Sequence, residues 1–236
     1  MLVAPGVTRL GSTRVNYYVV EDAGRLTLID AGMPGHFDQL DPALASMGAT
    51  LADVDAIVLT HAHVDHTGFA EKLRSQGTAT VHVHRDDTNG TVRKLPPLHL
   101  YWRPASWPLL AEGLSNGLLL TPAVRQRTVF TDDDVLDVPG KPRVVHLPGH
   151  TAGNCALLLD DAGVVFTGDG LVTLDPYTGR RGPRLLLDGV NEEPAQARSS
   201  LQRLAGLGRR IVLPGHGEPW EGDLADAVAQ AQAQAG

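Results

Sequence analysis

Three imidazoles and one carboxylate lie within six residues of this chain, in the segment His61-Ala-His63-Val-Asp65-His66. Imidazole and carboxylate together are ligands of zinc, iron and manganese, and the segment has no cysteine that would favour a thiolate-binding metal. The alternative is a polar surface loop that is rich in histidine by chance. With 10 histidines in 236 residues, so dense a chance grouping is improbable, and the segment predicts a metal site.

The segment follows the apolar run 56–60 and precedes the helix-like stretch 68–73, so it occupies a strand-to-helix turn. Four more glycine-bearing turns each follow an apolar run of strand length and carry one further candidate ligand: Asp30, His150, Asp169 and His216. Glycine accepts positive φ and lets the backbone approach an ion closely. In open α/β sheets, ligands bind outside the carboxyl ends of the strands. We therefore expect the five turns to face one cleft.

The order His-x-His-x-Asp-His, then His, Asp and His, resembles that of the metallo-β-lactamase superfamily of hydrolases, over the stretch from Asp30 to His216. The resemblance implies an αββα four-layer sandwich of two mixed β-sheets with flanking helices, whereas hydrophobic periodicity alone indicates only an α/β protein. Because the matching turns span nearly the whole chain, we expect residues 1–236 to form a single domain. The segment 85–139 departs from the superfamily pattern and is predicted to be a lid-like insertion.

The resemblance also implies two divalent metal ions, with zinc favoured and iron or manganese as alternatives. The first ion would be held by His61, His63 and His150. The second would be held by Asp65, His66 and His216. Asp169 would bridge the two ions, and Asp65 would also carry a proton towards the leaving group. Asp30 matches an aspartate behind the metal cluster that orients a ligand; the alternative is a plain turn-forming aspartate.

This ligand set implies hydrolysis of a small ester, lactone or thioester by a metal-bridging hydroxide. The alternative is a mononuclear iron redox protein similar to persulfide dioxygenases, or a non-catalytic metal-binding member of the same fold. Glyoxalase II thioesterases share the seven ligands but add a C-terminal helical domain, whereas this chain ends 20 residues after His216. Acyl-homoserine lactonases have a tyrosine three residues after the bridging aspartate; here Val172 stands there, and Tyr177 is the candidate substitute.

Composition limits the partners and the compartment. The formal charge of −7 and a pI near 5.7 argue against nucleic acid, which is usually bound by a basic surface. No apolar run approaches the roughly 20 residues of a membrane span. The first residues also lack the positively charged region followed by an apolar stretch that is typical of a signal peptide, so we expect a cytoplasmic protein without a membrane partner. A small-molecule substrate and a possible homodimer are the remaining partners. Cys155, the single cysteine, is predicted to be a buried strand residue and not a reactive thiol.

The segment 95–110 contains three aromatic residues, Tyr101, Trp102 and Trp107. It is either a wall over the metal cleft, with Trp102 or Trp107 facing the metals, or a surface that packs on the body or on a second copy. The five remaining histidines have no supporting pattern and are left out of the metal site. They are His36, His82, His84, His99 and His146.

Patterning places strands at 15–20, 25–29, 79–84 and 143–147 and a hairpin at 154–167. Helices are expected at 36–47, with Pro42 either in the first turn or splitting the helix, at 68–76, at 193–206 and from 223 onwards. Asn191 is expected to cap the helix at 193–206.

Overall fold

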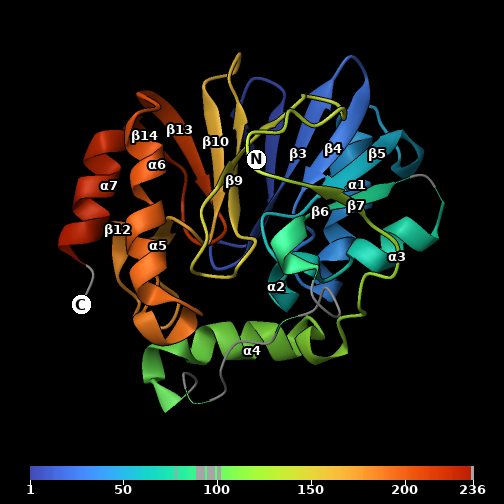
Figure 1. Ribbon diagram of the computed structural model, residues 1–236. Helices are drawn as coiled ribbons and strands as arrows, with labels where there is room; N and C mark the ends of the chain where they lie inside the picture. Colours follow the sequence, from blue (N-terminus) through green and yellow to red (C-terminus); the bar gives the residue numbers. More distant parts are fainter. Residues whose placement is uncertain (78, 89–93, 95–98, 100–101, 235–236) are drawn as a thin grey trace.

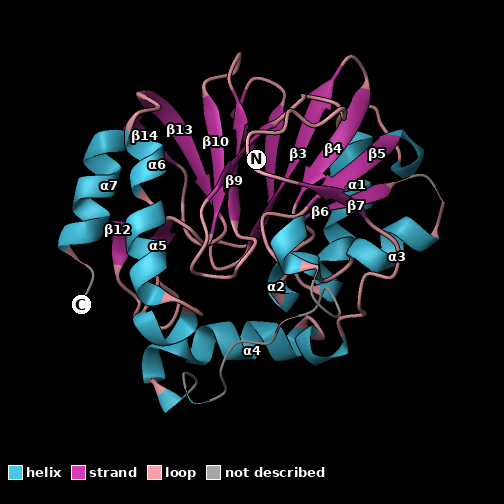
Figure 2. Ribbon diagram, in the orientation of Figure 1, coloured by secondary structure: helices cyan, strands magenta, loops and turns pink. Residues whose placement is uncertain are grey.

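Two β-sheets pack face to face in the computed structural model, with helices on both outer faces (Figures 1 and 2). The structure describes residues 1–77, 79–88, 94, 99 and 102–234. The expected architecture of two mixed sheets with flanking helices is confirmed.

The larger sheet has seven strands and the smaller has five; a separate two-stranded sheet lies beside them. The order in the larger sheet is β1 (Leu2–Ala4), β2 (Val7–Gly11), β3 (Asn16–Asp22), β4 (Arg25–Ile29), β5 (Val54–Val58), β6 (Thr80–His84) and β7 (Thr128–Phe130). The order in the smaller sheet is β14 (Trp220–Asp223), β13 (Arg209–Pro214), β10 (Val164–Gly168), β9 (Cys155–Leu159) and β8 (Arg143–His146). The separate pair is β11 (Val172–Leu174) with β12 (Arg181–Arg184).

Both large sheets are mixed. Strands β1 to β4 are antiparallel and β4 to β7 are parallel, while β10 and β13 form the parallel pair of the smaller sheet. The helices are α1 (Leu40–Ser46), α2 (Val64–Thr67), α3 (Ala70–Ser75), α4 (Trp107–Ser115), α5 (Pro194–Ser200), α6 (Gln202–Ala205) and α7 (Leu224–Ala233).

Apolar side chains that alternate along the strands fill the three interfaces between the layers of the sandwich. On β4, Ile29 points between the two sheets and packs in the cluster that includes Phe166 of β10. Its neighbour Leu28 points the other way, into the cluster that includes Leu44 of α1 and Leu73 of α3. A third cluster lies between the smaller sheet and helices α6 and α7. Since the central strands are buried on both faces, they are continuous apolar runs in the sequence.

The expected helices are present with shifted bounds. The stretch expected as one helix at 36–47 is divided into a 3-10 helix at Pro34–Gln39 and α1, and Pro42 lies in the first turn of α1. The single helix expected at 193–206 is instead two helices, α5 and α6, with Leu201 between them. Asn191 is not its cap: the residue before α5 is Glu193, and Pro194 occupies the first helical position. In the part of the chain that the structure describes, no helix has the length and apolarity needed to cross a membrane.

The described parts of the segment 85–139, the expected lid-like insertion, lie partly in the larger sheet and partly along the edge of the molecule. Strand β7 extends the larger sheet, and α4 runs along the lower edge of the molecule in Figure 1. Trp102 and Trp107 are 85% and 59% exposed, and whether either indole faces the metal centre stays a prediction. The buried residues of α4 are Leu109 and Gly113, and Leu109 packs in one cluster with Met33 and Tyr177. Tyr101 lies outside the described residues.

Candidate metal centre

The fold brings all seven predicted ligands together at one end of the sandwich. His61 and His63 follow β5, His150 follows β8, and Asp169 and His216 follow the parallel strands β10 and β13. Their donor atoms form two groups that could each hold a metal ion: His61, His63, His150 and Asp169, and Asp65, His66 and His216. Parallel strands end at the same sheet edge, and this geometry explains the convergence.

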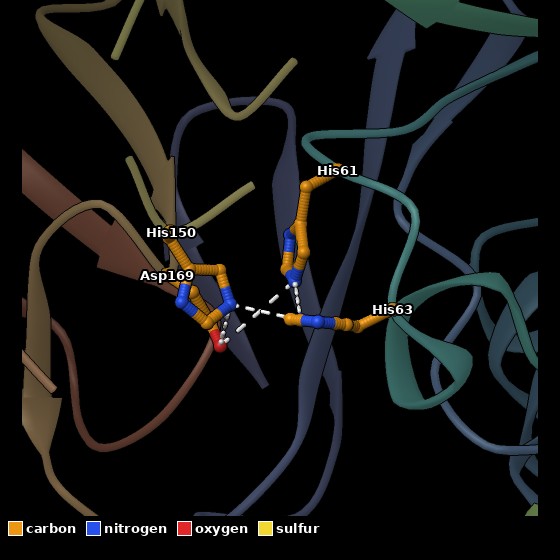
Figure 3. A group of neighbouring side chains, drawn as sticks. All are labelled: His61, His63, His150 and Asp169. Atoms are coloured by element: carbon orange, nitrogen blue, oxygen red, sulfur yellow. Dashed lines mark hydrogen bonds and ion pairs between the residues drawn. The ribbon is translucent and has the colours of Figure 1, made fainter. Parts of the chain in front are cut away.

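The first group is a tight set of three imidazoles (Figure 3). His61 Nε2 lies 3.1 Å from His63 Nδ1, which lies 2.9 Å from His150 Nε2. Ligand atoms of a tetrahedral zinc site with bonds of about 2.0–2.1 Å are about 3.3 Å apart, so these spacings suit one ion with minor adjustment. His150 Nε2 also lies 3.3 Å from Asp169 Oδ2.

Asp169, a member of the first group, also faces the second. Its Oδ2 is 3.0 Å from His216 Nε2, and its Oδ1 is 3.4 Å from His66 Nε2. Asp65 Oδ2 completes the second group, at 3.8 Å from His66 Nε2 and 3.7 Å from His216 Nε2. His66 Nε2 and Asp169 Oδ1 are both buried without a hydrogen-bond partner. A buried polar atom without a partner is costly, and a cation between these two atoms would satisfy both.

Four of the five ligand imidazoles are oriented by hydrogen bonds at their outer nitrogen. His66 Nδ1 donates to Asp30 Oδ2 at 2.9 Å, and His61 Nδ1 donates to Thr60 Oγ1 at 3.1 Å, a hydroxyl that itself donates to Asp30. His216 Nδ1 donates to the carbonyl of Arg14. A proton held on Nδ1 leaves the lone pair of Nε2 free to bind metal. Asp30 therefore occupies the place that the sequence predicts for it.

The fourth of these imidazoles depends on a residue that the sequence did not reveal. His150 Nδ1 lies 3.1 Å from Asn191 Oδ1. The Asn191 amide donates to the carbonyls of Leu186 and Leu187, at 3.3 and 3.4 Å, which directs its oxygen towards His150. Asn191 thus supports a ligand instead of capping a helix.

Burial and charge shift the histidine pKa values in opposite directions in the two groups. Burial, reinforced by the neighbouring imidazoles, holds the pKa values of His61 and His63 well below the ordinary range, so both are neutral and available to metal. Burial also acts to lower the pKa of His66, but the carboxylates of Asp169, Asp65 and Asp30 outweigh it and raise that pKa to about 10. Without metal, a proton on His66 balances these carboxylates.

The histidines left out of the site lie apart from these two groups where the structure describes them. The rings of His84 and His146 stack at 4.1 Å, with Asp86 Oδ2 3.8 Å from each, a third cluster that the sequence did not indicate. In this cluster His84 Nδ1 accepts from the Asp86 backbone, and His146 Nε2 donates to the Ala152 carbonyl. His36 is buried against Glu112, His82 contacts Thr80, and His99 is exposed.

A family model described as the metallo-beta-lactamase superfamily matches residues 10–216, and the chain belongs to this superfamily. It is 27% identical to the probable metallo-hydrolase YflN of Bacillus subtilis (strain 168), over 93% of this chain and 86% of that protein. It is 28% identical to a hydroxyacylglutathione hydrolase of Cereibacter sphaeroides, over 85% of this chain and 62% of that protein.

Solved structures agree with this membership. The metallo-beta-lactamase family protein TTHA1429 of Thermus thermophilus superposes with a TM-score of 0.69 at 27% identity, covering 97% of this chain and 79% of that one. The protein TTHA1623, solved in a di-iron-bound form, superposes with a TM-score of 0.60 at 27% identity, covering 95% of this chain and 96% of that one. The superfamily, the named relatives and the two donor groups fit a metal-dependent hydrolase.

Proposed function

We propose that this protein is a hydrolase that works with two divalent metal ions and acts on a small ester, lactone or thioester. His61, His63 and His150 would hold one ion. Asp65, His66 and His216 would hold the other, and Asp169 would be shared. The observation that carries the proposal is the buried Asp169 carboxylate between the two groups, with Oδ1 facing His66 Nε2 and neither atom otherwise partnered.

Two ions at these positions would supply a water activated near neutral pH and would polarise a substrate carbonyl. The side chains of the protein then have separate tasks. Asp30 and Asn191 hold His66 and His150 with Nε2 directed inwards. Asp65 has the most open of the three site carboxylates, with 13% of its side chain exposed, against 4% for Asp30 and Asp169. Its oxygen is therefore the one placed to hand a proton to a leaving group.

The substrate class rests on the relatives and on the donor set. Hydroxyacylglutathione is a thioester, and the relative named for its hydrolysis aligns over 85% of this chain. Because the alignment covers 62% of that relative, we carry over the acyl-transfer chemistry and not glutathione itself. The N and O donors suit zinc, and the di-iron form of TTHA1623 supports iron as the second candidate. The cytoplasmic location stays a prediction.

The test combines metal analysis with activity. Wild-type protein loaded with zinc or iron should contain two ions per chain and hydrolyse members of a panel of lactones, thioesters and esters. Asp169→Ala should retain at most one ion and lose at least about 100-fold in kcat/KM, since the ions contribute several kcal/mol to the transition state. Asp160→Ala is the matched control, because Asp160 pairs with Arg143 and Arg210 on an exposed surface. Full activity in Asp169→Ala would contradict the proposal.

A further inference from the structure

A second buried aspartate, Asp87, lies behind the metal centre and contacts none of the seven ligand side chains in the hydrogen bonds and ion pairs of the described residues. It is 1% exposed and follows β6 in a short 3-10 helix at Arg85–Asp87. Each of its two carboxylate oxygens accepts two hydrogen bonds. The donors are Ala62 N at 2.9 Å and Thr151 Oγ1 at 2.7 Å on Oδ2, and Gly153 N at 2.9 Å and Lys94 Nζ at 3.0 Å on Oδ1.

The first pair of contacts holds the turn after β5. Ala62 stands between His61 and His63, and its N–H donates to Asp87. The Ala62 carbonyl accepts from the backbone N–H of Lys94 at 2.8 Å, and the ammonium of Lys94 also binds Asp87. Both backbone polar groups of Ala62 are therefore anchored to one unit formed by Asp87 and Lys94. The turn that presents two imidazoles cannot shift without breaking it.

The other contacts hold the turn after β8, on the opposite sheet. Thr151 and Gly153 lie one and three residues after His150, and both donate to Asp87. Gly153 permits this close approach, because a Cβ there would lie 2.7–2.8 Å from Asp87 atoms. Lys94 Nζ also contacts Glu192 Oε1 at 2.9 Å, and the Glu192 backbone N–H donates to the His150 carbonyl at 3.2 Å.

We infer that Asp87 is a positioning residue that sets the separation of His63 from His150 and so the metal affinity of the three-imidazole group. These two imidazoles come from different sheets, yet His63 Nδ1 and His150 Nε2 lie 2.9 Å apart. One carboxylate receives donors from both turns, so it joins the two sheets at the point where the imidazoles meet. The inference rests on the proposed metal-dependent function. Outer partners of this kind typically change metal affinity by about 10- to 100-fold when they are lost.

The test is Asp87→Asn, which keeps the size of the side chain and replaces one acceptor oxygen by an NH2 donor. That NH2 must face either Ala62 N and Thr151 Oγ1 or Gly153 N and Lys94 Nζ, which are the donors of the native carboxylate. Co²⁺ titration with competition by a chelator, read by visible absorption, measures the affinity and ligand geometry of each ion. We expect one of the two constants to weaken about 10- to 100-fold with a changed spectrum, and the other to stay within about twofold.

Two further variants make the result decisive. Thr151→Val removes one donor to Asp87 while keeping the side-chain shape, and should weaken the same constant by a smaller factor; it also carries the test if Asp87→Asn does not fold. Asp175→Asn is the control, because Asp175 is buried and accepts from Tyr177 N and Thr178 Oγ1, but holds neither turn. It should leave both constants and the spectrum unchanged.

The outcomes separate this inference from the proposed function. Wild type that binds two Co²⁺ ions, with Asp87→Asn and Thr151→Val both retaining wild-type constants and spectrum, would overturn the role of Asp87 alone. Wild type that binds fewer than two ions would instead overturn the dinuclear proposal. A merely structural role for Asp87 would lower the melting temperature of the variant but leave the Co²⁺ spectrum of its folded fraction unchanged.

Discussion

Asp30→Asn should move the lone pair of neutral His66 from Nε2 to Nδ1. Asp30 has a φ of 61°, a left-handed conformation that asparagine tolerates, so the backbone need not move. In the native protein Thr60 N donates to Asp30 Oδ1 at 2.8 Å. If the amide oxygen of the variant keeps this hydrogen bond, the new NH2 faces His66 Nδ1. An NH2 group can only donate, so Nδ1 must accept, and the proton moves to Nε2, the nitrogen needed for metal.

The magnitude follows from the lost bond. A hydrogen bond to a charged group contributes about 1.5–3 kcal/mol. Each 1.4 kcal/mol is tenfold in affinity, so the ion held by His66 should bind about 10- to 150-fold more weakly. Wild-type metal content should still be reached at saturating metal, because the seven ligands themselves are intact.

The assay is chelator competition with Zn²⁺ on wild type, Asp30→Asn and the buried control Asp175→Asn, with kcat measured at saturating zinc. The weaker constant should appear in Asp30→Asn alone. Unchanged zinc constants in Asp30→Asn, with an unchanged kcat, would refute the idea that this carboxylate sets the tautomer of His66.

Three other results are expected. The pKa of His66 is raised to about 10 in the metal-free pocket, so its proton must leave when the second ion binds. Calorimetry at pH 6.5 in buffers of different ionisation enthalpy should therefore record at least one proton released by that ion, and its affinity should rise up to about tenfold per pH unit towards pH 10. A binding constant that does not change with pH would contradict this. His61 and His63 have lowered pKa values, so neither of these two imidazoles should release a proton when the first ion binds. Burial raises the pKa of Cys155 well above its usual range, so a thiol reagent should label it only after unfolding, and rapid labelling of the native protein would be the contrary result.

The ligands could be predicted from sequence because their chemistry and their position in the chain coincide. Each of the five turns follows a strand, and His or Asp beside glycine at a strand end has few structural reasons to recur in one chain. The sandwich itself came from the family resemblance, since the apolar runs of strands buried on both faces carry no alternation that would reveal how the sheets stack.

The supporting residues could not be predicted in the same way. Asp87 and Asn191 reach the ligand turns through contacts 25 to 66 residues away in the chain, and neither lies in a recognisable pattern. Asn191 resembled a helix cap because Glu192 and Glu193 follow it, but Pro194 starts the helix. The density of aromatic residues at 101–107 indicates either a wall over the cleft or a packed surface, and nothing in the sequence shows that Trp102 and Trp107 are 85% and 59% exposed whereas Leu109 is buried. Tertiary packing decided these positions.

Anomalous diffraction from crystals loaded with zinc, recorded on both sides of the zinc absorption edge, tests the dinuclear site most directly. Two peaks about 3.5–4 Å apart are expected. One should lie among His61, His63 and His150, the other among Asp65, His66 and His216, with Asp169 between them. A single peak in fully loaded crystals, or peaks that Asp169 does not contact, would contradict the account.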